Sequence, residues 1–166
     1  MAEIYSLQRK TLSALDRVER IASLNEWFVD RAADDEVNMI IATTWGDLTI
    51  SLNWRDDFES LHIACSLDGR VPGNRREEVA RLVTLLNEQL YFGHFDLWRQ
   101  DGTIVFRNSL ILSGGAGTSD AQCETLIQLA VEACERYFPS FQFVIWAGKT
   151  AEQSLAASLL ETAGEA

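Results

Sequence analysis

The segment LTISLNWR, residues 48–55, decides the fold class of this chain. Its apolar and polar residues alternate strictly, which is the period of a half-buried β-strand. The same alternation returns in LHIACSL, residues 61–67, after a short polar break at 55–57. Two such strands joined by a tight turn predict an antiparallel hairpin with one face on the core.

The alternating pattern extends on both sides of this hairpin. Residues 27–67 are typical of an antiparallel meander, with further short breaks at 33–36 and 45–47. A second hairpin is expected at 94–99 and 103–112, because the intervening turn contains a glycine that accepts positive φ. The strands together predict one antiparallel sheet of about five strands.

Three amphipathic helices are expected beside this sheet, at 13–24, 74–90 and 119–138. Their apolar residues recur with the period of about 3.6 that places them on one helical face. Ser13 and Ser119 are predicted N-caps, since each is followed three residues later by a side chain that completes a capping box. Asn74 is the expected N-cap of the middle helix, and Gly93 is placed where a left-handed C-terminal cap would end it.

The chain after the third helix permits two interpretations. Pro139 lacks an N–H donor and is expected to break or restart the helix. The aromatic and β-branched content of residues 141–146 suits a strand, whereas Pro139 and Gly148 as its limits favour one short helix. A last helix is expected over 151–161.

Composition fits a single packed α+β domain. The chain has 166 residues, of which 47% are hydrophobic, and its 14 basic and 25 acidic residues give a net charge of -11. This acidic balance argues against a nucleic-acid partner. No apolar stretch approaches the roughly 20 residues that cross a bilayer, and the mixed first twelve residues do not resemble a secretory signal. A cytoplasmic protein without a membrane partner is therefore predicted.

The cysteines and histidines do not form a recognisable chemical motif. Cys65, Cys123 and Cys134 contain no CxxC pair and are predicted core residues. His62 and His94 have no second ligand at helix or hairpin spacing, so no metal site is expected. The odd spacing of His62 and Cys65 places them on opposite strand faces. We therefore predict no catalytic residue and no cofactor.

Aromatic residues provide the strongest candidates for a partner-binding surface. Trp98 and Trp146 are the first choices, with Phe141 and Phe143 as neighbours of Trp146 in the sequence. Exposed aromatic surface is typical of such sites. Trp54 instead shares a strand face with the leucines of 48–52 and is assigned to the core.

A ligand pocket is the alternative candidate site. It would gather His62 and Arg107 with Gly114, Gly115 and Gly117 of the loop before the third helix. Backbone N–H groups at the start of a helix attract anions. The loop has neither a GK[ST] nor a GxGxxG motif, so a flexible connector is the favoured interpretation of its glycines.

Several ordered words in the sequence resemble one bacterial family. They include RVP at 70–72, GHF at 93–95, GGAG at 114–117 and ETAGEA at 161–166. The resemblance is to the YbjN-type proteins, described as sensory transduction regulators, and spans 24–166 as a single domain preceded by an arm and first helix at 1–23. It implies an α+β fold similar to type III secretion chaperones, which are small acidic proteins that commonly dimerise and hold partner polypeptides, and it implies no catalytic residues.

These observations predict a non-enzymatic protein-interaction module, chaperone-like or regulatory, that acts as a homodimer. Such a module would cover an apolar surface of a protein partner whose identity the sequence does not specify. The alternative is a small-molecule sensor or an enzyme with a pocket near the loop at 114–117.

Overall fold

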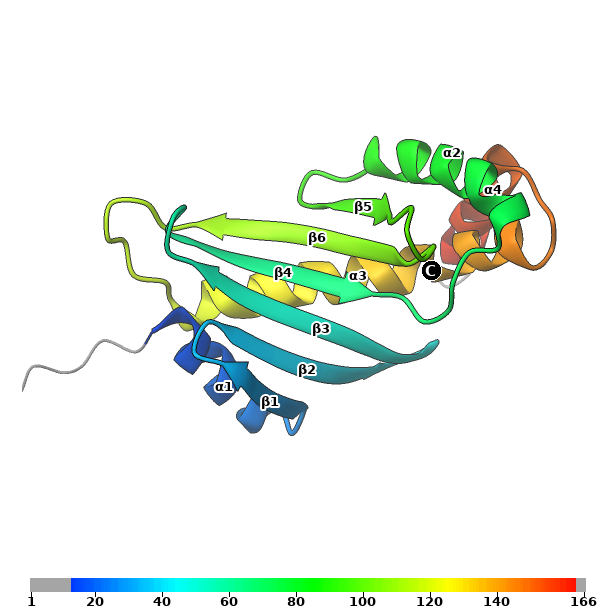
Figure 1. Cartoon of the computed structure of the whole chain (residues 1–166). Helices are drawn as coiled ribbons and strands as arrows, with labels where there is room; N and C mark the ends of the chain where they lie inside the picture. The colour runs from blue at the N-terminus through cyan, green and yellow to red at the C-terminus, as the bar shows by residue number, and fades with distance from the viewer. Residues whose placement is uncertain (1–12, 164–166) are drawn as a thin grey trace, which may run out of the picture.

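The computed structural model describes the backbone of residues 13–163 and the side chains of residues 13–160. The arm expected at the N-terminus lies outside these residues. The α+β fold is confirmed, with a sheet of six strands where about five were expected, in the order β1-β2-β3-β4-β6-β5 and antiparallel throughout (Figure 1). The strands are β1 (Phe28–Ala33), β2 (Glu36–Thr43), β3 (Gly46–Arg55), β4 (Ser60–Ser66), β5 (His94–Leu97) and β6 (Ile104–Ile111).

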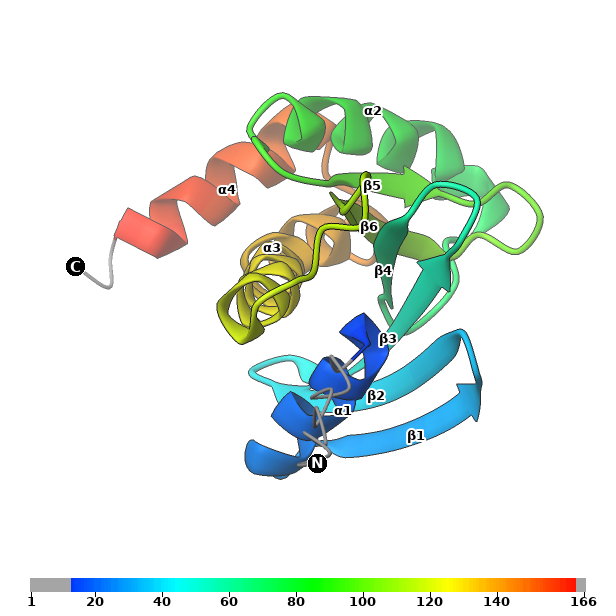
Figure 2. The ribbon, with the colours of Figure 1, turned by 90° about the vertical axis from the view of Figure 1, so that its left-hand side faces the viewer.

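The sheet curves around the longest helix (Figure 2). Helices α1 and α3 lie against its inner face, α2 lies beside β5, and α4 contacts α2 and α3, whereas no described helix covers the outer face. Both predicted capping boxes, at Ser13 and Ser119, are confirmed. The helices are α1 (Ala14–Leu24), α2 (Arg76–Asn87), α3 (Asp120–Ile145) and α4 (Ala151–Ala163), with a 3₁₀ turn at Gly73–Arg75 before α2.

A row of directly paired side chains crosses the sheet and forms the centre of the core. The row consists of Met39, Ile50, Cys65, Phe106 and Phe95, which are all fully buried. This row confirms the alternation of residues 48–55 and 61–67, because partners in an antiparallel sheet share a face. Burial of each large apolar side chain stabilises the fold by about 1.5–3 kcal/mol.

Aromatic contacts join this row to α3. The Phe95 ring meets Phe106 at 5.3 Å and Phe141 at 5.4 Å between centroids, and it meets Tyr137 at 6.1 Å, all edge to face. This arrangement is the preferred one for aromatic pairs. Phe141 is therefore a core residue, with only 1% of its surface exposed.

The expected break at Pro139 is wrong, because α3 continues through it to Ile145. The proline leaves the carbonyl of Glu135, four residues earlier, without its helical N–H donor. The indole Nε1 of Trp45, in the turn between β2 and β3, donates a hydrogen bond to that carbonyl at 3.1 Å. The Trp45 ring also stacks on Phe138 at 5.9 Å, so a distant turn satisfies the group that the proline leaves free.

The expected limits of the second helix are also corrected. Asn74 lies in the 3₁₀ turn and is not the N-cap of α2, which begins at Arg76. The helix ends at Asn87, several residues before Gly93, and the side-chain amide of Asn87 bonds to the backbone of Phe95. Gly93 is left-handed, with φ +70°, but it allows the chain to enter β5 instead of capping a helix.

The last helix and the cysteines follow the predictions. Thr150 accepts a hydrogen bond from the backbone N–H of Gln153 at the start of α4. Cys65, Cys123 and Cys134 are free and buried. Trp54 is partly buried against the core, and its indole donates to Asp56.

Replacement of Gly93 by alanine should lower the free energy of unfolding by at least about 2 kcal/mol. The cost of the left-handed backbone and the cost of the overlap between the new Cβ and its neighbours add together. A Cβ there would lie 2.4 Å from the ring of Phe106 and 2.7 Å from the carbonyl of Arg107. Gly148→Ala is the matched control, with φ +65° and open space around it, and should cost only the backbone strain. Urea unfolding that gives equal losses for the two variants would contradict this account.

The bond between Trp45 and Glu135 can be tested by a double-mutant cycle. Trp45→Phe keeps the stacking but removes the donor, which should cost about 1 kcal/mol of unfolding free energy. In a Pro139→Ala background the loss should be smaller, because the alanine N–H supplies the donor within the helix. An equal loss in both backgrounds would show that the proline and the tryptophan are not coupled.

Candidate functional site

Three side chains on the outer face of the sheet form a polar network. His62 is paired with Ser109 across β4 and β6, and its Nδ1 lies 2.9 Å from the serine hydroxyl. Its Nε2 accepts a hydrogen bond from Arg107 Nε at 3.4 Å. Because a guanidinium only donates, Nε2 carries the lone pair and Nδ1 carries the hydrogen that is donated to Ser109.

This network continues along the sheet to the edge strand. Arg107 pairs with Asp96 at 3.3 Å, and His94 lies 3.3 Å from the same carboxylate. Burial, followed by the positive charge of Arg107, lowers the pKa of His62 below its usual 6.5. His62 is therefore neutral near pH 7, in the tautomer that the hydrogen bonds require.

The geometry does not favour His62 as a base for Ser109. A general base needs its lone pair directed at the hydroxyl proton. Here the lone pair of His62 faces Arg107, and the imidazole donates to the serine instead. The network lines a hollow of about 550 Å³ that is also bordered by polar residues such as Arg55 and by the aromatic residues Trp54 and Phe58. Its polar groups suit recognition of a polar ligand.

The glycine loop lies at a different hollow and does not join this network. The backbone N–H groups of Gly114 and Gly115 donate to the carboxylate of Glu59 at 3.2 and 3.3 Å. A protein carboxylate therefore already holds the groups that would bind an anion. Gly115 and Gly117 line a hollow of about 460 Å³ between the start of α1 and the loop before α3. The predicted pocket is thus divided between two places.

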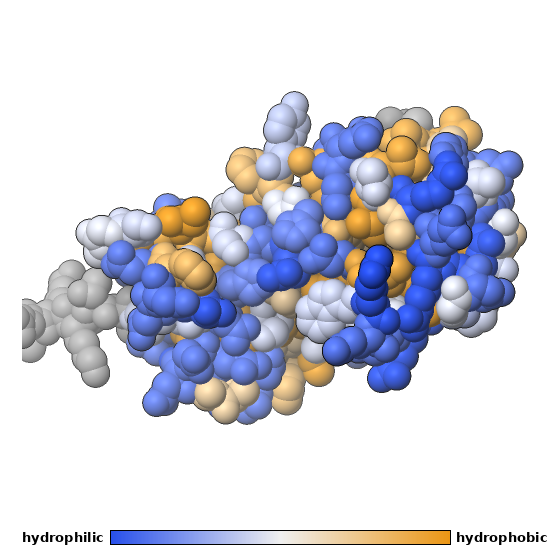
Figure 3. All heavy atoms as spheres, turned by 45° about the horizontal axis from the view of Figure 1, so that its top comes forward, coloured by the Kyte–Doolittle hydropathy of each residue, from blue (hydrophilic) through white to orange (hydrophobic). Residues whose placement is uncertain are grey.

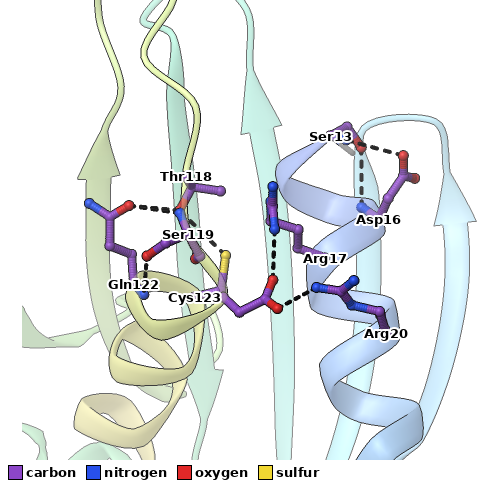
Figure 4. Close-up of polar contacts among 9 residues, drawn as sticks. Ser13, Asp16, Arg17, Arg20, Thr118, Ser119, Gln122 and Cys123 are labelled. Atoms are coloured by element: carbon purple, nitrogen blue, oxygen red, sulfur yellow. Dashed lines mark hydrogen bonds and ion pairs between the residues drawn. The ribbon is translucent and has the colours of Figure 1, made fainter. Parts of the chain in front are cut away.

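Polar contacts beside this hollow tie α1 to the start of α3 (Figure 4). Arg17 and Arg20 of α1 both reach the carboxylate of Asp120, the first at 2.8 Å. The two guanidinium groups, Arg17 above all, lower the pKa of Asp120. Thr118 lies 3.6 Å from the Cys123 thiol, and the capping box of Ser119 and Gln122 completes the corner. These contacts position elements and bring no reactive pair together.

An apolar groove lies where α3 ends, near the right-hand end of the sheet in Figure 1. It has a volume of about 290 Å³ between the segment 67–71 and the last turns of α3. Phe141 and Leu67 belong to its buried wall, and Trp146 lies at its margin with 79% of its surface exposed. The structure therefore brings two of the four aromatic candidates to one groove.

The other two aromatic candidates lie outside this groove. Trp98 is 47% exposed and lines a separate polar hollow of about 430 Å³ with Asp96 and Arg107. Phe143 is half-buried, and the Lys149 ammonium lies 4.9 Å from its ring centroid. The four predicted residues do not form one surface.

Several exposed apolar residues were missed by the sequence analysis. Tyr91 is 99% exposed and Phe92 63% exposed in the loop before β5, and Ile111 at the end of β6 is 72% exposed. On the face that Figure 3 presents, apolar side chains lie in separate patches among hydrophilic ones. These residues lie next to the ends of helices or strands, where the apolar periodicity of the sequence stops. Their position there was the one sign in the sequence that they could be exposed.

Neither a metal-binding cluster nor a membrane-spanning helix occurs among the described residues. Within residues 13–160 no group of three or more His, Cys, Asp or Glu side chains is arranged to hold a metal ion. None of the described helices has the length and apolar character needed to span a bilayer.

Comparison with known proteins identifies the family. The YbjN family model, described as "Putative bacterial sensory transduction regulator", matches residues 14–143 and so includes α1. The structure is similar to one described as "Crystal structure of YbjN, a putative transcription regulator from E. coli", at 10% identity and a TM-score of 0.52 over 74% of this chain and 88% of that one. No curated protein matches the sequence significantly. Since the family model covers most of its length, the chain belongs to the YbjN family.

Proposed function

We propose that this protein is a non-enzymatic, regulatory interaction module of the cytoplasm that binds an apolar side chain of a partner protein in the Trp146 groove. The observation that carries the proposal is an indole with 79% of its surface exposed beside a groove with buried apolar walls. The description of the YbjN family as a sensory regulator supports a regulatory role.

The shape and chemistry of the groove suit an apolar anchor. Its walls include Val71, Ile104 and Phe138, while Arg70 and Gln142 supply polar groups at the same site. An aromatic side chain buries about 150–250 Å², and tryptophan is among the residues that contribute most to interfaces. A partner side chain that enters the groove would remove both its own surface and that of Trp146 from water.

Hydrogen bonds hold the walls of this groove in place. Arg75 of the 3₁₀ turn donates to the carbonyls of Val144 and Lys149 at 2.9 and 3.0 Å. The Val71 N–H donates to the carbonyl of Gly102 at 2.9 Å, which ties the opposite wall to the turn between β5 and β6. A groove that is already formed lowers the ordering cost of binding.

The chemistry of the outer face supports the non-enzymatic part of the proposal. The polarity of the His62 hydrogen bonds is opposite to that of a base that activates Ser109. All three thiols are buried, and burial raises the pKa of Cys123, which disfavours a thiolate nucleophile there.

Recognition of a small anion on the outer face is a second candidate function. The observation that favours it is the convergence of Arg107, His62 and Ser109 on the hollow of about 550 Å³. The Arg107 side chain is 41% exposed, so its guanidinium, which pairs with Asp96 on one side, is accessible to a carboxylate or phosphate on the other. The loop at 114–117 takes no part in this site.

The groove can be tested by selection of displayed peptides on the immobilised protein. Selected peptides should share an apolar or aromatic residue, and Trp146→Ala should weaken a labelled peptide at least about tenfold, as expected for an interface hot spot. Fluorescence anisotropy measures the affinity. Trp98→Ala is the matched control, because it removes an exposed indole outside the groove. Unchanged affinity in Trp146→Ala, or failure to select any peptide, would count against the proposal.

The anion site can be tested through the pKa of His62, followed by NMR of its ring proton. The wild-type residue should titrate below 6.5, and Arg107→Gln should raise that pKa by removing a neighbouring positive charge. Inorganic phosphate should also raise it, since a bound anion favours the imidazolium. Arg99→Gln, an exposed arginine outside the network, is the control. A His62 pKa that is insensitive to phosphate would exclude this second function.

A further inference from the structure

The short strand β5 leaves part of its neighbour without a partner. Strand β5 pairs with β6 only from Ile104 to Arg107, and the last pair joins His94 to Arg107. The remaining segment, Asn108–Ile111, is paired with β4 on one side, and no described strand lies on its other side. In Figure 1, β5 accordingly lies beside only the right-hand half of β6.

The ladder pattern determines which backbone groups face this open edge. Leu67 donates to Ile104 at one end of the β4–β6 ladder, and Leu112 donates to Glu59 at the other. Hydrogen-bonded pairs alternate in an antiparallel ladder, so the even-numbered residues of β6 bond to β4. The N–H and C=O groups of Ser109 and Ile111 therefore point away from β4, toward the open edge.

The other two edges of the sheet are protected, whereas this one is not. Asn87 of α2 caps β5, because its amide accepts from the Phe95 N–H at 2.8 Å and donates to the Phe95 carbonyl. Strand β1 carries Asp30 and Arg31 and has a register shift next to them. Charges and bulges of this kind prevent edge pairing. Among the described residues, the corresponding protection of the β6 edge is one local hydrogen bond, which the Ser109 N–H donates to the side chain of its neighbour Asn108.

The side chains of this edge suit contact between two acidic proteins. The segment NSLIL, residues 108–112, has no charged residue in a chain of net charge -11. Ile111 is 72% exposed on the outer face, and Leu110 is partly buried against the core. Pairing of two copies through this segment therefore brings no like charges of its own together, although the chain as a whole is acidic.

We infer that the β6 edge is the interface with a second copy of this chain. A twofold axis perpendicular to the sheet, beside Leu110, would set Leu110 opposite the partner's Leu110. Ser109 and Ile111 then face the partner's Ile111 and Ser109, and each pair exchanges two N–H···O=C bonds. This self-pairing is possible because the two outward-facing residues lie symmetrically about Leu110, as an isologous contact requires. The Ser109 N–H exchanges its bond to Asn108 for one to the partner.

The same symmetry joins the two outer faces into one continuous surface. Ser109 belongs to the polar network with His62, and in the dimer the partner's Ile111 lies beside it. The partner's Ile111 would thus add apolar surface to the hollow of about 550 Å³, which Trp54 and Phe58 already line. The Trp146 groove lies at the opposite end of the sheet and stays accessible, so the interface does not depend on the proposed function.

Sedimentation velocity of the full chain tests the interface. The wild type is expected at twice the chain mass of 18.6 kDa at high micromolar concentration. Ile111→Pro should shift it to the monomer, because the proline removes an N–H that points away from β4 and leaves the fold intact. Ile111→Lys should do the same by placing a charge at the edge. Phe28→Lys, which places a lysine at a 64% exposed residue on the β1 edge, should leave the dimer unchanged.

Hydrogen exchange on the unmodified chain gives an independent readout. In the wild type, the backbone amide of residue 111 should exchange more slowly as protein concentration rises. In Ile111→Lys, the amide at the same position should exchange rapidly and independently of concentration. A wild type that stays monomeric to about 1 mM would overturn the inference. A dimer that persists in both folded Ile111 variants would also overturn it, because the interface would then lie elsewhere.

Discussion

The packing of α3 inside the curve of the sheet is the constraint on which the rest of the structure depends. This one helix of 26 residues contacts β4 and β6 as well as the other three helices. The Phe95 ring joins the sheet row to Tyr137 and Phe141 of α3. Because interiors are close-packed, the helix cannot shift without moving this row. The groove at the end of α3 is shaped by the same packing.

One-sided burial determines where the protein can interact. The helices satisfy the inner face of the sheet, so the outer face is left with polar side chains such as His62, Arg107 and Ser109. Large exposed apolar side chains therefore occur at separate places in the described structure, among them Phe28, Ile111 and Trp146. The two contacts that we propose accordingly use a groove and a strand edge instead of one broad apolar face.

Pro139 shows why the rule that proline ends a helix gave a wrong prediction here, although other elements were predicted correctly from the sequence. The lost N–H of proline usually ends a helix, but here the cost is met by Trp45, which is far away in the sequence. The apolar residues on both sides of Pro139 also pack into one core, and that burial favours a continuous helix. Gly93 is the converse case, since its left-handed backbone was recognised while its role, close approach to Phe106, depends on a neighbouring strand.

The sequence by itself determined the fold class, the strand faces, the capping boxes and the family, because periodicity and capping are local properties of the chain. It also grouped His62 and Arg107 with the glycines of the loop at 114–117 as one candidate site, and Trp98, Trp146, Phe141 and Phe143 as another. Only the tertiary structure decided that Phe141 belongs to the core, that Glu59 occupies the amides of the glycine loop, and that β5 leaves the end of β6 open. Each of these depends on which distant residues meet, and that is set by the packing of the sheet around α3.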